Sequence, residues 1–225
     1  MTRALLSLGF LLAVFPPACG FAAAPAPLYD APAPTARATP PIRWAHSCAA
    51  GTPTDGRLVH GVLLPAEGRT FFTWDFPLRR SPNRAWRRWG TDRLVRTTLR
   101  VLDGYSAAHP EAPRVTIGDL SRPRGGPFGP EYGFPGHASH QNGLDIDIYY
   151  PRRDRRERAA VVVTQVDRRL SQDLVNRFVS IGAERVYVGR RVGLRGPRGV
   201  VVPLWRYHEN HMHVRLRPGG AACRR

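Results

Sequence analysis

The spacing of apolar and polar residues changes along this chain, and its longest helical pattern lies between residues 91 and 109. Thr91 is suited to cap the first turn, Asp92 suits the positive start of a helix, and Pro110 ends the segment. Apolar residues on one side recur every three or four positions, as an amphipathic helix requires; they are Leu94, Val95, Leu99, Leu102 and Tyr105.

A second helix is expected over residues 172–181. Ser171 would cap it, and Gly182 would end it by adopting the left-handed conformation that glycine tolerates. Its apolar stripe consists of Leu174, Phe178 and Ile181.

Five shorter segments have the pattern of strands, either alternating with period two or forming brief apolar runs. They span residues 114–119, 144–149, 185–188, 200–202 and 211–216. Helices and strands do not alternate regularly, which argues against a parallel βαβ fold. With 225 residues, and 22 each of glycine and proline, we expect one α+β domain: a central antiparallel sheet flanked by a few helices and long loops.

The N-terminal segment, residues 1–24, is typical of a secretory signal peptide. Arg3 precedes an apolar stretch that is too short for a membrane span of about 20 residues, and small residues follow it up to Ala24. Cys19 follows Pro-Pro-Ala, which does not fit a lipoprotein signal. Residues 25–41 are rich in proline and alanine and predict an extended tether, so the folded domain would span residues 42–225.

Two cysteines remain after removal of the signal peptide, Cys48 and Cys223. An exported chain passes into an oxidising compartment, so we expect a disulfide between them. In the chain-entropy description, closing so long a loop stabilises the fold by up to about 5 kcal/mol.

The formal net charge is +17, and all 34 basic residues are arginine. Such a charge favours association with anionic wall polymers or membrane surfaces. Nucleic acid is a weaker expectation, because the chain has an export signal and no pattern of aromatic residues for stacking on bases. The sequence carries no signal for an oligomeric state.

Five of the eight histidines lie in two short windows, residues 136–147 and 207–213. On a strand, His211 and His213 point to the same face, while Met212 and Val214 point to the other. Residues 145 and 147, both aspartate, likewise oppose leucine and isoleucine neighbours. Two adjacent strands of this kind would gather histidine and carboxylate on one side of a sheet.

Histidine nitrogens with one carboxylate oxygen suit a catalytic zinc ion, which takes three protein ligands and keeps a position for water. His140, Asp147 and His213 supply such a set, for one zinc ion per chain. A single His-x-His pair arises by chance on surface strands, but the two windows together, in an exported chain, favour a metal site.

The spacing of His140, Asp147 and the His211-Met212-His213 triplet resembles the superfamily of lysostaphin, D-Ala-D-Ala metallopeptidases and hedgehog proteins. Within it, residues 136–147 and 208–215 are similar to the penicillin-insensitive murein endopeptidases. Residues 57–62, 89–91 and 118–127 add weaker support, so the resemblance extends from about residue 48 to the C-terminus. Glu209 and Met212 depart from the family pattern, where aspartate and an aromatic residue are expected.

The resemblance implies a periplasmic or extracytoplasmic zinc peptidase that hydrolyses the D-alanyl–meso-diaminopimelyl cross-link of peptidoglycan. A zinc D,D-carboxypeptidase or dipeptidase with the same site remains an alternative, as does a non-catalytic, zinc-stabilised wall-binding module. His208 and His211 argue against the last of these, because a binding module has no need of a base.

For the mechanism, zinc would lower the pKa of a bound water, His211 would act as the general base, and His208 would donate a hydrogen bond to the developing oxyanion. Glu209 is a rival base. Four further residues have open roles around the metal or the substrate. His137 is a fourth ligand, a contact to the substrate or to a ligand, or a locally bonded loop residue, and Asp145 either orients a histidine or is only solvated. Asp119 lies at a strand end before a Gly/Pro-rich loop that would shape the site, and Arg215 is a candidate contact for a substrate carboxylate.

Overall fold

The computed structural model describes residues 41–133, 136–219 and 223. The predicted signal peptide and residues 25–40 of the predicted tether lie outside the described residues. Among the helices that are described, none is both long and apolar enough to cross a membrane.

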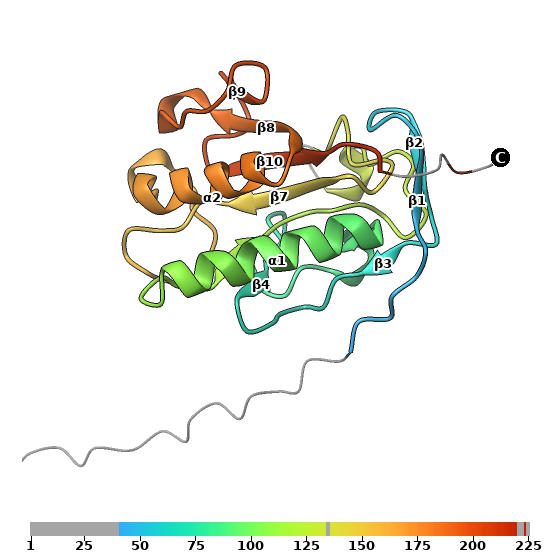
Figure 1. Ribbon diagram of the computed structural model, residues 1–225, viewed down its shortest axis with the longest axis horizontal. Coiled ribbons are helices and arrows are strands. Elements are labelled where there is room, and N and C mark those ends of the chain that lie inside the picture. The colour runs from blue at the N-terminus through green and yellow to red at the C-terminus, as the bar shows by residue number, and fades with distance from the viewer. Residues whose placement is uncertain (1–40, 134–135, 220–222, 224–225) are drawn as a thin grey trace, which may run out of the picture. The chain divides into compact units, whose positions relative to one another are not determined.

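A six-stranded sheet forms the middle of the domain, in the order β4, β6, β7, β10, β8, β9 (Figure 1). The inner strands β6, β7, β10 and β8 pair antiparallel, whereas the outer pairs β4–β6 and β8–β9 are parallel. The strands span Phe71–Thr73 (β4), Val115–Ile117 (β6), Asp145–Tyr149 (β7), Ala183–Gly189 (β8), Val201–Leu204 (β9) and His211–Leu216 (β10). The last five confirm the strands expected from alternation.

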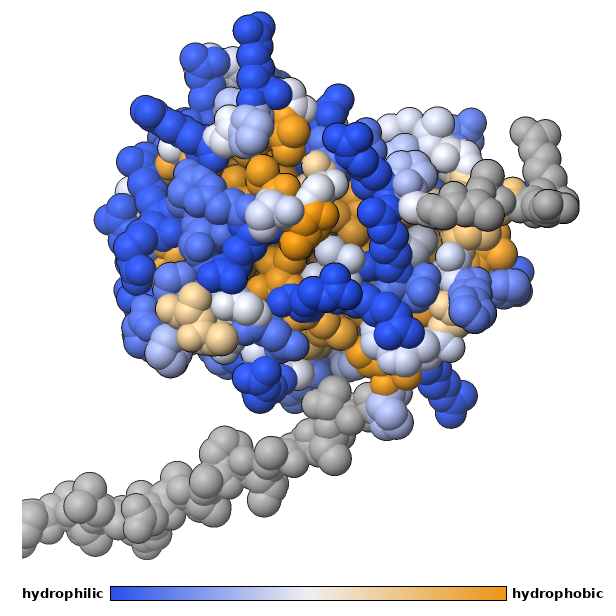
Figure 2. Space-filling model, viewed as in Figure 1, coloured by the Kyte–Doolittle hydropathy of each residue, from blue (hydrophilic) through white to orange (hydrophobic). Residues whose placement is uncertain are grey.

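Both α-helices, α1 (Asp92–Ala108) and α2 (Arg168–Ser180), cover the same face of this sheet (Figure 1). Their apolar stripes pack with the apolar side chains of β7, β8 and β10 in one continuous core. The two helices cover one face of the sheet, and long loops cover the other. The described residues therefore form a single α+β domain, which confirms the predicted fold class. On the helical face, hydrophilic side chains project outward and hydrophobic residues are seen mainly between them (Figure 2).

The two helix starts test the capping predictions. The side chain of Thr91 accepts a hydrogen bond from the amide of Leu94, as predicted for α1. The prediction for α2 is wrong at its start, because Asp167 is the cap and accepts from the amide of Leu170. Ser171 instead lies buried within the first turn, where its hydroxyl bonds back to the Asp167 carbonyl. Two arginines precede Leu170 and obscure the apolar period there.

The end of α2 follows the prediction only in part. Leu174 and Phe178 are buried in the core, but Ile181 is 37% exposed. Ile181 is the C-cap, so it lies beyond the last full turn and off the apolar stripe. Gly182 follows in the left-handed region at φ +81°, as a helix-terminating glycine does.

Two small sheets and the disulfide close the end of the domain farthest from α2. Strands β1 (Cys48–Gly51) and β2 (Gly56–Val59) form a hairpin, and β3 (Val62–Leu63) pairs with β5 (Trp89–Gly90). None of these four short strands has a clear sequence pattern. The predicted disulfide between Cys48 and Cys223 is present and joins β1 to the C-terminal segment.

Candidate active site

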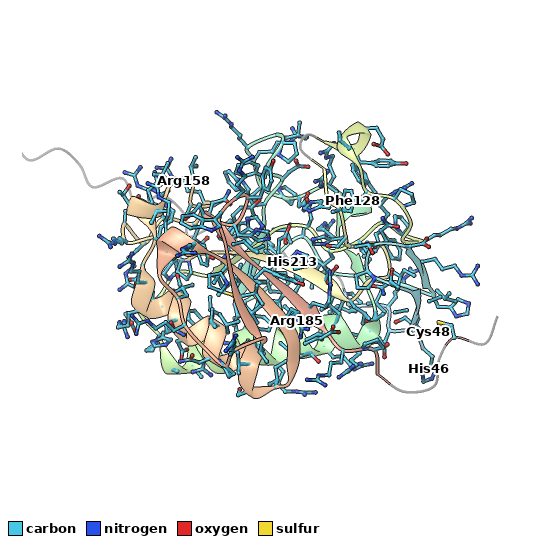
Figure 3. All side chains as sticks on the ribbon, turned by 90° about the horizontal axis from the view of Figure 1, so that it is seen from above. His46, Cys48, Phe128, Arg158, Arg185 and His213 are labelled. Carbon is cyan, nitrogen blue, oxygen red and sulfur yellow. A yellow bond between two sulfur atoms is a disulfide. The ribbon has the colours of Figure 1, made fainter. Side chains whose placement is uncertain are left out.

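The site begins with the register between β7 and β10. Asp147 lies opposite His213, Tyr149 opposite His211, and Asp145 opposite Arg215. The intervening residues of both strands point into the core beneath the helices and are fully buried. The two alternating windows are therefore adjacent strands, and their histidines and carboxylates share the face opposite α1 and α2. His213 lies near the middle of the molecule on this face (Figure 3).

His140 reaches the same place from the loop that precedes β7. Its backbone lies in the left-handed region at φ +68°, which is uncommon and strained for a residue other than glycine. Its amide donates to Asp145 Oδ2 at 2.9 Å, and its Nδ1 contacts the carbonyl oxygen of Leu120. Because a carbonyl oxygen only accepts, Nδ1 carries the hydrogen and Nε2 keeps a lone pair directed at the strands.

Three donor atoms converge at this point. His140 Nε2 lies 3.1 Å from His213 Nδ1 and 3.4 Å from Asp147 Oδ1, and the last two atoms are 3.2 Å apart. The ligands of a tetrahedral zinc ion, about 2.1 Å from the metal, are separated by about 3.4 Å. All three side chains are almost fully buried, and Asp147 Oδ1 has no hydrogen-bond partner among the described residues. The donor set therefore fits a metal ion.

Burial alone would favour neutral Asp147, but the charges and hydrogen bonds of the surrounding histidines hold its pKa well below the usual value. Burial lowers the pKa of His140. Burial also acts against a charged His213, yet Asp145 and Asp147 outweigh it and raise the pKa of His213 to about 9. Asp147 is therefore ionised and His140 is neutral, whereas His213 carries a proton that a bound metal cation would displace.

His137 lies beside this cluster and offers a second choice of third ligand. His137, His140 and Asp147 have ligand atoms within 4.8 Å of one another. However, His137 Nε2 is 2.7 Å from Asp119 Oδ2, and its Nδ1 is 3.8 Å from Asp147 Oδ2. The ligand atoms of His140, Asp147 and His213 lie closer together than those of this second set. His137 instead lies between the carboxylates of Asp147 and Asp119.

Asp119 is held by Arg87, which the sequence analysis did not identify. The Arg87 side chain is only 2% exposed; its Nε donates to Asp119 Oδ1 at 2.6 Å and its Nη2 contacts Oδ2. Asn83 donates to the same carboxylate at 2.9 Å. Despite burial, the hydrogen bonds of His137 and Arg87 hold the pKa of Asp119 well below normal. In a chain with 34 arginines, nothing in the sequence distinguishes Arg87.

A second ion pair supports the other side of the cluster. Arg215 donates to Asp145 through Nε at 2.7 Å and through Nη2 at 3.2 Å. Asp145 Oδ1 lies 3.3 Å from His213 Nε2, the nitrogen that faces away from Asp147. The carboxylate of Asp145 thus contacts both His213 and the amide of His140. Arg215, expected as a contact for a substrate carboxylate, is paired with Asp145 and also lines the cleft described below, so that role stays a prediction.

His211 lies beside the Asp147 carboxylate. Its Nδ1 lies 2.7 Å from the amide oxygen of Asn210, which holds the hydrogen on Nδ1. Its Nε2 lies 3.7 Å from Asp147 Oδ1. Burial lowers the pKa of His211 to about 3, against the opposing charge of Asp147. His211 is therefore neutral near pH 7, with Nε2 available to accept a proton.

The remaining two candidates lie on the approach to β10. His208 packs against His211, with ring centroids 5.0 Å apart, and its Nδ1 lies 3.1 Å from the carbonyl oxygen of Arg206. The Nε2 atom of His208 is consequently a donor only when the ring is protonated, and burial lowers its pKa. Glu209 lies beside Arg191: its Oε1 accepts from the Arg191 amide at 3.4 Å, and its Oε2 is buried with no hydrogen-bond partner among the residues that the structure describes.

These groups open into a cleft of about 920 Å³. Its polar lining includes Asp119, Asp147 and four histidines, and its aromatic lining consists of Phe76, Tyr149, Tyr187 and Tyr207. The four histidines are His137, His208, His211 and His213. A separate cavity of about 730 Å³ lies at the disulfide and is lined by no histidine. The cleft therefore combines space for an extended ligand with every predicted metal and catalytic residue except the buried His140.

Comparison with known proteins agrees with this geometry. The sequence model of the penicillin-insensitive murein endopeptidases matches residues 49–187, which include His137, His140, Asp145 and Asp147 and end before β10. Curated relatives of that name extend further. The protein of Yersinia pestis bv. Antiqua is 27% identical over 209 residues, covering 82% of this chain and 73% of the relative. That of Haemophilus influenzae is 25% identical over 191 residues, covering 74% of this chain and 62% of the relative.

The sequence match covers more than half of the chain, and the described structure brings together histidine and aspartate side chains that could hold a metal ion, on the face of the sheet opposite the helices. The chain belongs to the penicillin-insensitive murein endopeptidase family of peptidases.

Proposed function

We propose that this protein is a zinc-dependent endopeptidase that hydrolyses the D-alanyl–meso-diaminopimelyl cross-link of peptidoglycan. Family membership supports the reaction class and the polymer. The observation that carries the proposal is the convergence of His140, Asp147 and His213, whose donor atoms lie 3.1 to 3.4 Å apart. Asp147 and His213 line the cleft, and His140 is buried against them.

These three residues would hold the zinc ion. Imidazole nitrogen and carboxylate oxygen are ligands that zinc prefers, and three of them leave a position for water. A zinc ion bound there supplies Lewis acidity, lowering the pKa of a water and polarising the scissile carbonyl. The contacts to Leu120 and Asp145 fix the rings of His140 and His213, so the ligands are oriented before the metal arrives.

His211 is our candidate for the general base. Its Nε2 carries a lone pair, faces Asp147 at 3.7 Å and opens to the cleft. A base in this position accepts the proton of the attacking water and returns it to the leaving amine. Glu209 is the weaker candidate, because its carboxylate is directed toward the backbone of Arg191.

His208 would stabilise the oxyanion of the tetrahedral intermediate. Because Nδ1 is engaged with the Arg206 carbonyl, this role requires a protonated ring. His208→Gln, which keeps a neutral side-chain donor, is therefore the informative variant. If it retains most of kcat where His208→Ala does not, the oxyanion role stands; equal losses would assign His208 to proton transfer or packing.

We further propose that the protein acts outside the cytoplasm, in the periplasm or an equivalent compartment. The disulfide between Cys48 and Cys223 supports this location, because such bonds persist in oxidising compartments. The predicted signal peptide points the same way. Peptidoglycan lies in this compartment, so substrate and enzyme would meet there.

The test combines metal content with product analysis. Purified protein should contain one zinc ion and convert cross-linked muropeptide dimers into monomers, and a chelator should abolish the conversion. His211→Ala should keep its zinc and lose most turnover, whereas His46→Ala, which alters an exposed histidine far from His213 (Figure 3), should change neither. Zinc binding without cleavage would indicate a binding module, release of terminal D-alanine alone would indicate a carboxypeptidase, and absence of zinc would refute the metal site.

A further inference from the structure

The segment that follows β9 exposes two large aromatic side chains at the rim of the cleft. Trp205 is 70% exposed and Tyr207 is 71% exposed, the highest values among the large hydrophobic residues described. Aromatic side chains of this size are usually mostly buried, so two of them separated by one residue on an open surface indicate a binding function.

The backbone holds Tyr207 in this position at a conformational cost. Its φ is +70°, in the left-handed region that disfavours residues other than glycine. Such strain persists where the surrounding structure imposes it, and it is concentrated at functional sites. Leu204, Tyr207 and His208 line the cleft on either side of Trp205, so the segment that carries both aromatic residues runs along the edge of the cleft.

Arginine side chains complete this surface. The guanidinium of Arg190 lies 3.9 Å from the centroid of the Trp205 ring, which orients the ring and covers one of its faces. Arg191 and Arg206 flank the same segment, and none of these three arginines forms an ion pair within the described part of the chain. The surface therefore joins aromatic faces to cationic hydrogen-bond donors that pair with no carboxylate of the described residues. We call it the rim platform, comprising Arg190, Trp205, Arg206 and Tyr207.

We propose that the rim platform docks the glycan strand of peptidoglycan while the cross-link lies in the cleft. The C–H faces of pyranose rings pack against flat aromatic rings, and guanidinium groups donate to sugar hydroxyls and to the carboxylates of stem peptides. This inference rests on the proposed function, because the stem peptides are covalently attached to the glycan. A peptide seated in the cleft brings its sugar chain to the rim.

Binding to glycan alone tests the platform independently of catalysis. Glycan strands stripped of their stem peptides by an amidase contain no bond for this enzyme to cleave, so the intact protein can be titrated with them. We expect Trp205→Ala/Tyr207→Ala to weaken binding at least tenfold, and Trp205→Phe to retain most of it. The control is Trp44→Ala, which removes a tryptophan that is 40% exposed and has Arg96 over its ring at 3.7 Å.

Turnover on two substrates then connects the platform to the reaction. On cross-linked, glycan-bearing muropeptides, the single variant Trp205→Ala, which leaves the lining of the cleft intact, should show a KM at least threefold higher with little change in kcat. On cross-linked peptide dimers freed of glycan, the kcat/KM of Trp205→Ala should equal that of the wild type. Equal losses on both substrates, or no loss on either, would overturn the proposal.

Two further outcomes separate the possible failures. If wild-type protein cleaves neither substrate, the proposed function fails, while binding of stripped glycan still decides the platform. If single-stranded nucleic acid binds as tightly as glycan and the double variant loses both, the platform is a general aromatic–arginine surface and the assignment to glycan is wrong.

Discussion

Removing Arg87 gives the most direct test of how the site is held together. The residue is almost fully buried in the lining of the cleft, where it forms two contacts to Asp119, and Asp119 in turn holds His137. Arg87→Met keeps a long, flexible side chain but leaves the Asp119 carboxylate, 8% exposed, without its cation. A buried ion that loses its partner destabilises a fold by about 3–5 kcal/mol.

The lower end of that range is expected here. Asn83 and His137 continue to donate to Asp119, so two of its hydrogen bonds survive the substitution. We therefore expect the free energy of unfolding to fall by about 3 kcal/mol. Asp119→Asn should destabilise by a similar amount by leaving the guanidinium unpaired. The double variant should be more stable than the sum of the two losses predicts, because replacing both partners leaves no buried charge unpaired.

Urea unfolding of metal-free protein, followed by tryptophan fluorescence, measures all three variants. Arg69→Met is the matched control, because Arg69 pairs with Asp103 on the surface, with side chains 77% and 57% exposed. That substitution should cost less than about 1 kcal/mol. A loss below 1 kcal/mol for Arg87→Met, or strictly additive losses in the double variant, would refute the view of Arg87 and Asp119 as a coupled buried pair.

Three further predictions concern the metal, the disulfide and a helix cap. Asp145→Asn weakens the contact that orients His213. Zinc affinity, measured by competition with a chelating dye, should therefore fall 10- to 100-fold while the fold persists. Unchanged affinity would contradict this role of Asp145. Replacing Cys48 and Cys223 with serine opens a loop with a sequence separation of 175. The free energy of unfolding, measured by denaturant titration, should fall by about 2–5 kcal/mol. Equal stability would refute a structural role for the disulfide. Asp167→Ala removes the N-cap of α2 and should cost about 1 kcal/mol; no loss would reject this cap.

Several features of this protein follow from the sequence because they depend on neighbouring residues. The side-chain period of a strand is two, so His211 and His213 share a face whatever the strand pairs with. The cap at Thr91 and the apolar stripe behind it predict α1 for the same local reason. The histidine spacing also indicates the family, and its sequence model matches residues 49–187.

Other features were decided only when distant segments came together. The pairing of β7 with β10 sets His213 opposite Asp147, and a shift of one residue would turn one set of side chains into the core. Arg87 becomes part of the site because burial strengthens its pairing with Asp119, which no local pattern reveals. Exposure likewise distinguishes Trp205 from the other tryptophans. Register, burial and exposure depend on contacts between residues far apart in the chain, so the tertiary structure alone determines them.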